Sequence, residues 1–550
     1  MEKIWLKNYH PSVTPTIPSL QQDLLDLFFE TCEKFKNHSA YSSFDKEISY
    51  DDLKNLSLQL AGYLQSQNLK KGDRIALQLP NVLQYPVSLW ASLLSGLTVV
   101  NLNPVYTKRE TLKVLQDSGA KAIIMLSSCA HNLEQIYKET SLETIIITKP
   151  GDLLNSPKKQ LLNFVFKYIK KKEKNYKINM SVSFLEALSF KSQKKFQIQK
   201  KNMDDVLFIQ YTGGTTGVPK GACLTQKNIL SNLKQCQLWF DPYLDHGKEC
   251  VLAPLPLYHI FAFLVNGLLL FLYGAKSVLI ADPRNISQLI PVIKKHPFTI
   301  GIGVNTLFKA LILHPKFKTI DFSTWKFSVA GGMSLEENIQ KNWKKITGVK
   351  IIEGYGLTEA SPVVSSNFID EPKNKSIGCP LPSTEIRIVN PKGEELSIDE
   401  DGELEVKGPQ VMQEYYNNPE ETQKVLTSDG WLKTGDIASI DKDGYIFIKD
   451  RKKDMIIVSG FNVYPNEIED VLGHHPEIKD STVVGVKDDY SLEAIKAFVV
   501  KNTPELQAEA IKKYCKEYLA PYKIPKHIEF VDEIPKTMVG KPLRRLLKDK

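Results

Sequence analysis

A run of glycine, threonine and lysine residues is the part of the sequence best suited to chemistry. It spans residues 211–221, has the sequence Tyr-Thr-Gly-Gly-Thr-Thr-Gly-Val-Pro-Lys-Gly, and directly follows the apolar residues 206–210. Glycines let several backbone N–H groups face one point, threonine hydroxyls add donors, and the ammonium group of Lys220 attracts an anion. The run predicts a loop that binds a polyphosphate. A surface turn is the alternative for an ordinary glycine-rich loop, but the length and order of these residues favour phosphate binding.

Other familiar nucleotide and hydrolase motifs are missing from the chain. No Gly-Lys-Ser or Gly-Lys-Thr occurs, so the run is not the loop of P-loop nucleotide hydrolases, and there is no Gly-x-Gly-x-x-Gly dinucleotide turn. No Gly-x-Ser-x-Gly segment is present, which disfavours a thioesterase with a serine nucleophile. The phosphate loop therefore belongs to a different class of nucleotide-using protein.

Four further segments with motif-like sequences follow the loop along the chain. They are Tyr355-Gly356-Leu357-Thr358-Glu359, the segment 431–436, the segment 450–454, and Pro535 through Lys541. Together with residues 211–221 they resemble the acyl-adenylate-forming superfamily of acyl-CoA ligases, luciferases and peptide-synthetase adenylation domains. The segments 429–470, 255–263 and 303–308 are especially similar to bacterial long-chain fatty-acid–CoA ligases. The resemblance covers essentially the whole chain.

The resemblance implies a reaction that uses ATP, Mg²⁺ and CoA. A carboxylate attacks the α-phosphate of ATP to give an acyl-AMP and pyrophosphate, and the acyl group then passes to CoA. Because both partners of the first step are anions, cations must lie between them. The resemblance assigns Lys220 to the β- and γ-phosphates, Glu359 to Mg²⁺, and Lys541 to the carboxylate and α-phosphate oxygens. These three are the expected catalytic residues.

The remaining nucleotide contacts also come from the resemblance. Asp436 is expected to accept hydrogen bonds from the ribose hydroxyls, Arg451 to contact ribose or phosphate, and Tyr355 to stack on adenine. A turn aspartate after glycine is the alternative for Asp436. The full expected ATP-binding set is Tyr211, Thr212, Gly213, Gly214, Thr215, Thr216, Gly217, Lys220, Gly331, Gly332, Gly354, Tyr355, Gly356, Thr358, Asp436 and Arg451.

The acyl and CoA sites are expected near His259 and Gly460. The resemblance puts His259 at the mouth of the acyl pocket, although a histidine beside apolar residues is equally compatible with a packed core position. Residues 260–265 contain no acid, whereas amino-acid-activating relatives place an aspartate near here, so an uncharged acyl chain is implied. Gly460 lies in the segment that would be presented to the pantetheine arm. Fatty acid and CoA are thus the expected substrates.

Alternating segments of two kinds indicate the elements that position these residues. From Arg74 to Gly356, short β-rich runs alternate with longer helical patterns, which predicts βα units and parallel-rich sheets in an α/β fold. After Pro380, short strands separated by Gly- and Asp-rich turns predict a small antiparallel β unit. We expect a large N-terminal domain, 1–449, with βα subdomains to about 380 and the β unit at about 381–449. Residues 450–550 should form a mobile α+β domain that carries Lys541, with Asp450 as the hinge.

Charge is concentrated in one segment. The net charge of the chain is +8, but Lys158–Lys201 holds 13 lysines against two glutamates, a net +11. A general nucleic-acid surface is therefore a poor explanation. Between Leu161 and Lys174, Leu161, Phe164, Val165 and Tyr168 share one helical face and Lys167, Lys170, Lys171 and Lys174 share the other. That pattern predicts a helix lying on an anionic membrane; a solvated charge run is the alternative.

Cysteine use and apolar segments indicate the compartment. Seven cysteines, widely spaced and without a Cys-x-x-Cys pair, favour reduced, metal-free thiols. Residues 1–10 lack the apolar run of a signal peptide, and 260–274 is too short to span a bilayer and is expected to be a buried helix beside a pocket. We expect a cytoplasmic protein, peripheral on the cytoplasmic face of the membrane, and the resemblance favours a homodimer.

These observations predict an AMP-forming long-chain fatty-acid–CoA ligase. One alternative is an adenylate-forming ligase for aryl or short- and medium-chain acids. An alternative of a different class is a non-catalytic, membrane-associated nucleotide-binding protein, against which the intact set of Thr216, Lys220, Glu359, Asp436 and Lys541 argues. The acyl chain length is left open by the sequence.

Overall fold

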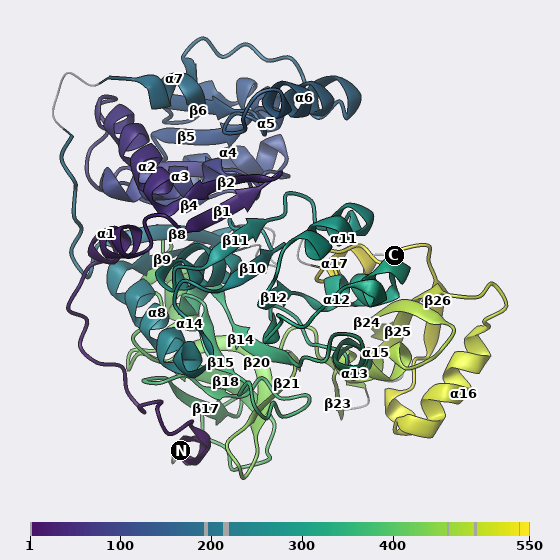
Figure 1. The fold of residues 1–550 in the computed structure, drawn as a ribbon. Helices are drawn as coiled ribbons and strands as arrows, with labels where there is room; N and C mark the ends of the chain where they lie inside the picture. The colour runs from purple at the N-terminus through teal and green to yellow at the C-terminus, as the bar shows by residue number, and fades with distance from the viewer. Residues whose placement is uncertain are drawn as a thin grey trace.

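Two large, mostly parallel sheets build the N-terminal part of the protein in the computed structural model (Figure 1). The structure describes residues 3–191, 196–212, 219–458, 461–488, 492–537 and 540–548. The first sheet has eight strands in the order β19-β9-β8-β4-β3-β5-β6-β7. They are β3 (Arg74–Gln78), β4 (Thr98–Asn101), β5 (Ala122–Leu126), β6 (Thr144–Thr148), β7 (Ser181–Ser183), β8 (Val206–Thr212), β9 (Lys220–Thr225) and β19 (Glu414–Tyr415).

The second large sheet has nine strands in the order β16-β15-β14-β13-β12-β10-β11-β1-β2. They are β1 (Ser39–Ser43), β2 (Lys46–Ser49), β10 (Cys250–Ala253), β11 (Lys276–Leu279), β12 (Ile300–Gly303), β13 (Phe327–Ala330), β14 (Ile351–Gly356), β15 (Val363–Ser366) and β16 (Cys379–Pro380). Every residue of β5, β6, β10, β12 and β13 is buried. Strands covered on both faces need continuous apolar runs, which explains the segments that the sequence showed. The predicted parallel α/β fold is confirmed.

Helix α8 (Gln226–Phe240) follows β9 of the first sheet and precedes β10 of the second. It begins with a capping box between Thr225 and Asn228, which satisfies free backbone N–H groups of its first turn. The amide of Asn228 also donates to the carbonyls of Pro409 at 2.9 Å and Val411 at 2.8 Å. One residue thus starts the helix and fixes the segment that leads to β19.

The predicted antiparallel β unit is a sheet in the order β17-β18-β20-β21. Its strands are β17 (Glu385–Val389), β18 (Gly402–Lys407), β20 (Leu432–Ile440) and β21 (Ile446–Arg451), and each pair is antiparallel. No crossover helix is needed between antiparallel strands, so short turns suffice. Strand β21 lies at the edge of this sheet.

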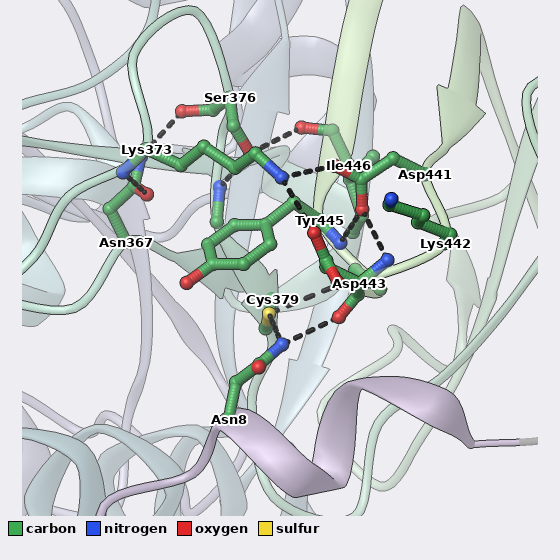
Figure 2. Close-up of polar contacts among 12 residues, drawn as sticks. Asn8, Asn367, Lys373, Ser376, Cys379, Asp441, Lys442, Asp443, Tyr445 and Ile446 are labelled. Atoms are coloured by element: carbon green, nitrogen blue, oxygen red, sulfur yellow. Dashed lines mark hydrogen bonds and ion pairs between the residues drawn. The ribbon is translucent and has the colours of Figure 1, made fainter.

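Polar contacts fix the hairpin between β20 and β21 (Figure 2). Asn8 ends the short helix η1 (Ile4–Asn8) and donates to the backbone carbonyl of Asp443 at 2.6 Å. Lys373 contacts Asp441 at 2.5 Å and Asp443 at 3.3 Å, and its ammonium lies 4.6 Å from the ring centre of Tyr445. These contacts hold the turn in place, and both strands of the hairpin carry predicted site residues.

The last part of the chain has its own sheet and its own cores. Strands β22 (Ile456–Val458), β23 (Phe461–Val463), β24 (Ile478–Asp488), β25 (Leu492–Lys501) and β26 (His527–Phe530) are accompanied by α15 (Pro465–Gly473), α16 (Ala508–Tyr518) and α17 (Arg545–Lys548). The large hydrophobic core contains residues between Trp5 and Ile446, whereas separate clusters begin at Ile456. In Figure 1 this yellow unit lies beside the N-terminal part, next to α12 (Asn305–Leu313) and α13 (Glu337–Thr347).

The basic segment differs in part from its prediction. It forms α6 (Lys158–Phe164) and a π-helical turn, η3 (Val165–Ile169), and the helix ends there. Lys171 has φ +47°, so Lys170, Lys171 and Lys174 do not continue the helix as the sequence suggested. That part of the prediction was wrong because strong helical periodicity in the apolar positions hid the point where the backbone turns. Leu162 and Phe166 pack on the core.

The apolar stretch 260–274 is a buried helix, as predicted. It consists of α9 (Ile260–Ala262), a π-helical segment η5 (Phe263–Leu269) and α10 (Leu270–Leu272). Within the described ranges, no helix is long and apolar enough to cross a membrane. All seven cysteines are buried free thiols.

Candidate active site

The two ends of the predicted phosphate loop lie in a pair of antiparallel strands. Strands β8 and β9 are antiparallel, and Thr212 pairs with Lys220 in register. The loop therefore leaves one strand and returns along its neighbour, unlike a loop that leads into a helix. The predicted residues Gly213, Gly214, Thr215, Thr216 and Gly217 lie outside the described residues, as does Gly460.

Tyr211, in strand β8, has a partner inside the protein. Its side chain is buried, and its hydroxyl donates to the carboxylate of Asp117 at the end of α4 (Lys108–Ser118). Burial and that carboxylate both raise the pKa of Tyr211 well above its ordinary value. The Tyr211 hydroxyl is therefore engaged within the protein, and the residue anchors the start of the loop.

Lys220 and Glu359 are brought together by a tyrosine. Lys220 forms an ion pair with Glu421 of α14 (Pro419–Val425), and its ammonium lies 5.4 Å from the ring centre of Tyr415. The hydroxyl of Tyr415 donates to Oε1 of Glu359 at 2.5 Å. The hydrogen bond from Lys220, followed by that from Lys424, lowers the pKa of Glu421 to about 2. A cation and two carboxylates thus meet beside the loop.

The predicted adenine-bracketing glycines lie at the ends of adjacent parallel strands. In the register of β13 and β14, Ala330 pairs with Glu353, so Gly331 and Gly354 follow side by side. A Cβ on Gly331 would lie 3.2 Å from the Phe261 ring and 3.4 Å from the carbonyl oxygen of Gly354. On Gly356 it would lie 2.1 Å from the carbonyl oxygen of Pro362, which only glycine permits.

Two further residues of the expected ATP-binding set, Gly332 and Thr358, lie close to these strand ends in the sequence. Gly332 is exposed and has φ +81°. Thr358 opens the short helix η7 (Thr358–Ala360) that carries Glu359. The segment from Gly354 to Glu359 therefore runs from a strand end directly into the carboxylate next to Tyr415.

Asp436 lies in strand β20, next to a backbone irregularity rather than in a β-turn. Gly435 has φ +71°, and the register of β20 shifts nearby. The Asp436 carboxylate is almost fully buried; it accepts a hydrogen bond from the hydroxyl of Tyr355 at 2.5 Å and pairs with Nε of Arg451 at 2.7 Å. Burial first, and then the Asp436 charge, raise the pKa of Tyr355 well above its ordinary value.

Lys541 enters the same region from the C-terminal unit. Thr537 and Lys541 are joined by two hydrogen bonds: the N–H of Thr537 donates to the Lys541 carbonyl at 2.8 Å, and the Lys541 N–H donates to Oγ1 of Thr537 at 3.1 Å. Gly540 has φ +81°, and a Cβ there would lie 2.5 Å from Oγ1 of Thr306 in α12. The turn is thus seated on the N-terminal part of the protein.

The surroundings of Lys541 control its charge. Burial first, and then the positive charge of Arg451, lower the pKa of Lys541 to about 8, while Asp436 and Glu359 act in the opposite direction. Burial, and after it the charge of Lys541, lower the pKa of His259 to about 4, so this half-buried imidazole is neutral at neutral pH. Lys541 therefore lies within electrostatic range of four predicted site residues.

Asp450, the predicted hinge residue, lies within strand β21. It pairs with Ile437 in the antiparallel sheet, and its side chain is buried. The Lys452 N–H still donates to the carbonyl of Gly435 at 2.9 Å, so the sheet extends past Asp450. Burial raises the pKa of Asp450 to about 6, against the positive charge of Arg544.

Three acidic or aromatic residues of this region were missed by the sequence analysis. Tyr415 and Glu421 do not belong to a recognisable sequence motif. Their partners in space, Glu359 and Lys220, are far away in the sequence. Glu353 ends the buried part of β14; burial raises its pKa to about 8, and its Oε2 has no hydrogen-bond partner among the described residues. Its position directly before Gly354 was the only signal that could have marked it.

The arrangement suits a nucleotide with a metal ion. Lys220, Arg451 and Lys541 carry positive charges that suit phosphates, and Asp436 is a buried acceptor that suits hydroxyls. Over the described part of the chain, no group of three or more His, Cys, Asp and Glu side chains could hold a metal ion. Mg²⁺ needs no such cage, because it is usually held by one or two carboxylates together with substrate phosphates. Glu359 fits that requirement.

Comparisons with known proteins identify the family of the chain. The model of the "AMP-binding enzyme" family matches residues 28–416, and that of the "AMP-binding enzyme C-terminal domain" matches residues 467–541. The chain therefore belongs to the AMP-binding enzyme family. A long-chain-fatty-acid–CoA ligase from Salmonella typhimurium is 46% identical over 552 residues, which is 100% of this chain and 98% of the relative. A second, from Bacillus subtilis, is 37% identical over 99% of this chain and 98% of its own length.

Solved structures share the architecture. An anthranilate CoA ligase in complex with anthranoyl-AMP superposes with a TM-score of 0.84 at 25% identity, covering 97% of this chain and 98% of that chain. ATP-bound MatB from Rhodopseudomonas palustris gives a TM-score of 0.82 at 26% identity, covering 96% and 99%. The predicted resemblance and fold class are confirmed.

Proposed function

We propose that this protein is a long-chain fatty-acid–CoA ligase that performs both half-reactions in the cleft between its two parts. It activates a fatty acid with ATP, releasing pyrophosphate and forming acyl-AMP, and then transfers the acyl group to CoA. The observation that carries the assignment of residues is the contact between the loop of Lys541 and Thr306 of the N-terminal part, which brings Lys541 under the influence of the charges of Glu359, Asp436 and Arg451. The similarity to long-chain-fatty-acid–CoA ligases, at 46% and 37% identity over nearly the whole chain, supports a fatty acid as the substrate.

In the first half-reaction, cations offset the charge that builds up on the phosphates. Lys220 exchanges its contact with Glu421 for the β- and γ-phosphates, and Lys541 stabilises the charge on the carboxylate and α-phosphate oxygens. Asp436 holds the ribose hydroxyls, and Arg451 keeps Asp436 oriented through their ion pair. Glu359 would hold Mg²⁺, which offsets phosphate charge when it is bound.

The second half-reaction needs a different arrangement. Lys541 occupies the cleft, so the C-terminal unit rotates about Asp450, removes Lys541 and presents the segment around Gly460 to the pantetheine arm of CoA. The separate hydrophobic cores on either side of Asp450 support a rotation of the unit as a body. Residues 450–550 are thus the mobile domain of the proposal.

The acyl chain is proposed to lie next to the buried helix 260–272. His259 at its start is neutral, and the residues that follow it are mostly buried and apolar. Such surroundings suit an uncharged chain and exclude an amino-acid ammonium group. A ligase for aryl or short acids is the alternative, and pyrophosphate release with a panel of acids separates the two. Self-association as a homodimer, implied by the family resemblance, is part of the proposal.

Lys541→Ala should separate the two half-reactions. Loss of its charge should slow acyl-AMP formation by about 100-fold or more, because groups that stabilise developing charge contribute on that scale. Conversion of supplied acyl-AMP and CoA should be nearly unchanged, since Lys541 is outside the cleft in that step. The matched control is Lys548→Ala, an exposed lysine on α17. Equal slowing of both steps in a folded Lys541→Ala variant would contradict the proposal.

Glu359→Gln should change the response to metal. The amide keeps the shape of the side chain and removes the charge that would hold Mg²⁺, so ATP–pyrophosphate exchange should need a higher Mg²⁺ concentration and reach a lower maximum. A Mg²⁺ titration of the exchange rate measures this, with thermal melting to show that the fold is kept. Glu420→Gln, on the nearby helix α14, is the control and should behave like the wild type. An unchanged Mg²⁺ dependence in Glu359→Gln would refute the role.

We further propose that the segment Lys158–Lys201 docks on anionic membrane. Apolar side chains on α6 and η3 are largely exposed: Leu161 at 63%, Phe164 at 54%, Tyr168 at 60% and Ile169 at 65%. Exposed lysines follow them directly, and an apolar face next to basic side chains is the chemistry of an interfacial segment. Lys167 is the exception among them, because it is half-buried and pairs with Glu173 at 3.5 Å.

Replacing four exposed lysines of the segment should weaken this binding. Each basic residue near an anionic surface contributes about 1 kcal/mol, and salt screens the attraction. The Lys170/Lys171/Lys172/Lys174→Gln variant should sediment less with vesicles that contain anionic lipid, and high salt should release the wild type. A control variant, Lys316/Lys318/Lys344/Lys345→Gln, removes the same charge from exposed positions elsewhere. Equal losses in both variants would show that only net charge matters and would overturn the docking site.

A further inference from the structure

The carboxylate of Asp450 reaches from one part of the protein into the other. Its backbone pairs with Ile437 in the sheet of the N-terminal part, yet its Oδ2 accepts the N–H of Asn466 at 2.7 Å in the first turn of α15. Tyr464, at the N-cap of α15, makes no capping hydrogen bond with its own side chain. Asp450 therefore caps this helix from outside, where a negative charge is favourable.

Arg544 completes the same contact from the C-terminal unit. Its guanidinium lies 3.5 Å from Asp450 and 3.3 Å from Asp454, and it donates to both carboxylate oxygens of Glu469 at 2.9 Å. It also donates to Oδ1 of Asn466 at 3.0 Å. Arg544 is largely buried, so one guanidinium offsets three carboxylates with little help from water.

Glu469 ties this cluster to the body of the C-terminal unit. Its Oε1 accepts hydrogen bonds from the hydroxyl of Thr482 at 2.8 Å and from the N–H of Val483 at 2.7 Å, both in β24. The position of Arg544 is therefore fixed relative to the sheet of its own unit, whereas Asp450 is fixed relative to the other.

Arg544 is also close to Lys541 along the chain. It lies three positions further along the chain, and the N–H of Leu543 between them donates to the carbonyl of Pro535 at 2.8 Å. The carbonyl of Arg544, directly before α17, accepts the N–H groups of Leu547 and Lys548. The turn that carries Lys541 and the guanidinium that meets Asp450 thus form one short, hydrogen-bonded unit.

We propose that Arg544 is a positioning residue that links the seating of Lys541 in the cleft to the hinge, through its contact with Asp450. This inference rests on the proposed division between the half-reactions. Rotation about Asp450 changes the path from β21 to α15, so the contact with Arg544 and Asn466 exists only while Lys541 is seated. A buried carboxylate that loses its cation is costly, and the contact therefore favours the arrangement that forms acyl-AMP.

Arg544→Met and Arg544→Lys test the link when both half-reactions of the full chain are measured separately. Arg544→Met should slow acyl-AMP formation on the order of tenfold, while conversion of supplied acyl-AMP and CoA should stay within about twofold of the wild type. Arg544→Lys keeps a charge near Asp450 and should recover part of the loss. The control is Arg545→Gln, because Arg545 is the exposed neighbour, and it should leave both rates unchanged.

A double variant distinguishes a link from a general loss of stability. If Arg544 acts through Asp450, adding Asp450→Asn to Arg544→Met should slow acyl-AMP formation by less than the product of the two single effects. Fully multiplicative effects, or equal slowing of both half-reactions in Arg544→Lys with an unchanged melting temperature, would overturn the inference. If Arg544→Met does not fold, Arg544→Lys alone decides the outcome.

The same measurements distinguish a failure of the role of Arg544 from a failure of the proposed division between the half-reactions. If Lys541→Ala slows both half-reactions equally, the proposed division of the reaction fails, whatever Arg544 does. If Lys541→Ala is selective but Arg544→Lys and Arg544→Met are not, the division stands and only the role of Arg544 is rejected.

Discussion

Lys541 lies under the influence of a positive charge, that of Arg451, and two negative charges, those of Asp436 and Glu359. The chemistry of the site depends on the balance between them. Lys541 is half-buried, and burial and the positive charge of Arg451 lower its pKa, while Asp436 and Glu359 oppose them. The balance leaves an ammonium group that is charged near neutral pH and only weakly held by the protein. Such a group can give its charge to a phosphate or carboxylate oxygen without first breaking a strong ion pair.

The fold supplies that balance by bringing together the ends of distant strands. Strand β14 leads into Glu359, β20 carries Asp436, β21 carries Arg451, and the C-terminal turn carries Lys541. Two hydrogen bonds from tyrosine hydroxyls, Tyr415 to Glu359 and Tyr355 to Asp436, hold the carboxylates in place. Glu359 is therefore oriented by a neutral donor, whereas Asp436 is held by both a neutral hydroxyl and the guanidinium of Arg451.

Much of this could be predicted from the sequence, for identifiable reasons. Strands such as β6, with the sequence Thr-Ile-Ile-Ile-Thr, are buried on both faces, so their apolar runs revealed the parallel sheets. The segments around Lys220, Glu359 and Lys541 were visible because each has several chemically constrained residues in a row. Tyr415, Glu421 and Arg544 could not be found in this way, since each acts on a partner far away in the chain. The end of the basic helix at Ile169 was also hidden, because a π-helical turn does not interrupt the apolar pattern.

If the charge of Lys541 is used to form acyl-AMP, the rate of this half-reaction should follow the protonation of its ammonium group. Below a pKa of about 8 the ammonium is protonated, and above it the charge is lost. The value of kcat/KM for ATP–pyrophosphate exchange reports groups of the free enzyme, so it should fall as the pH rises through about 8. In Lys541→Arg the guanidinium stays charged over this range, and the fall should move to higher pH even if the maximum rate is lower. A decline at the same pH in both proteins would contradict the account.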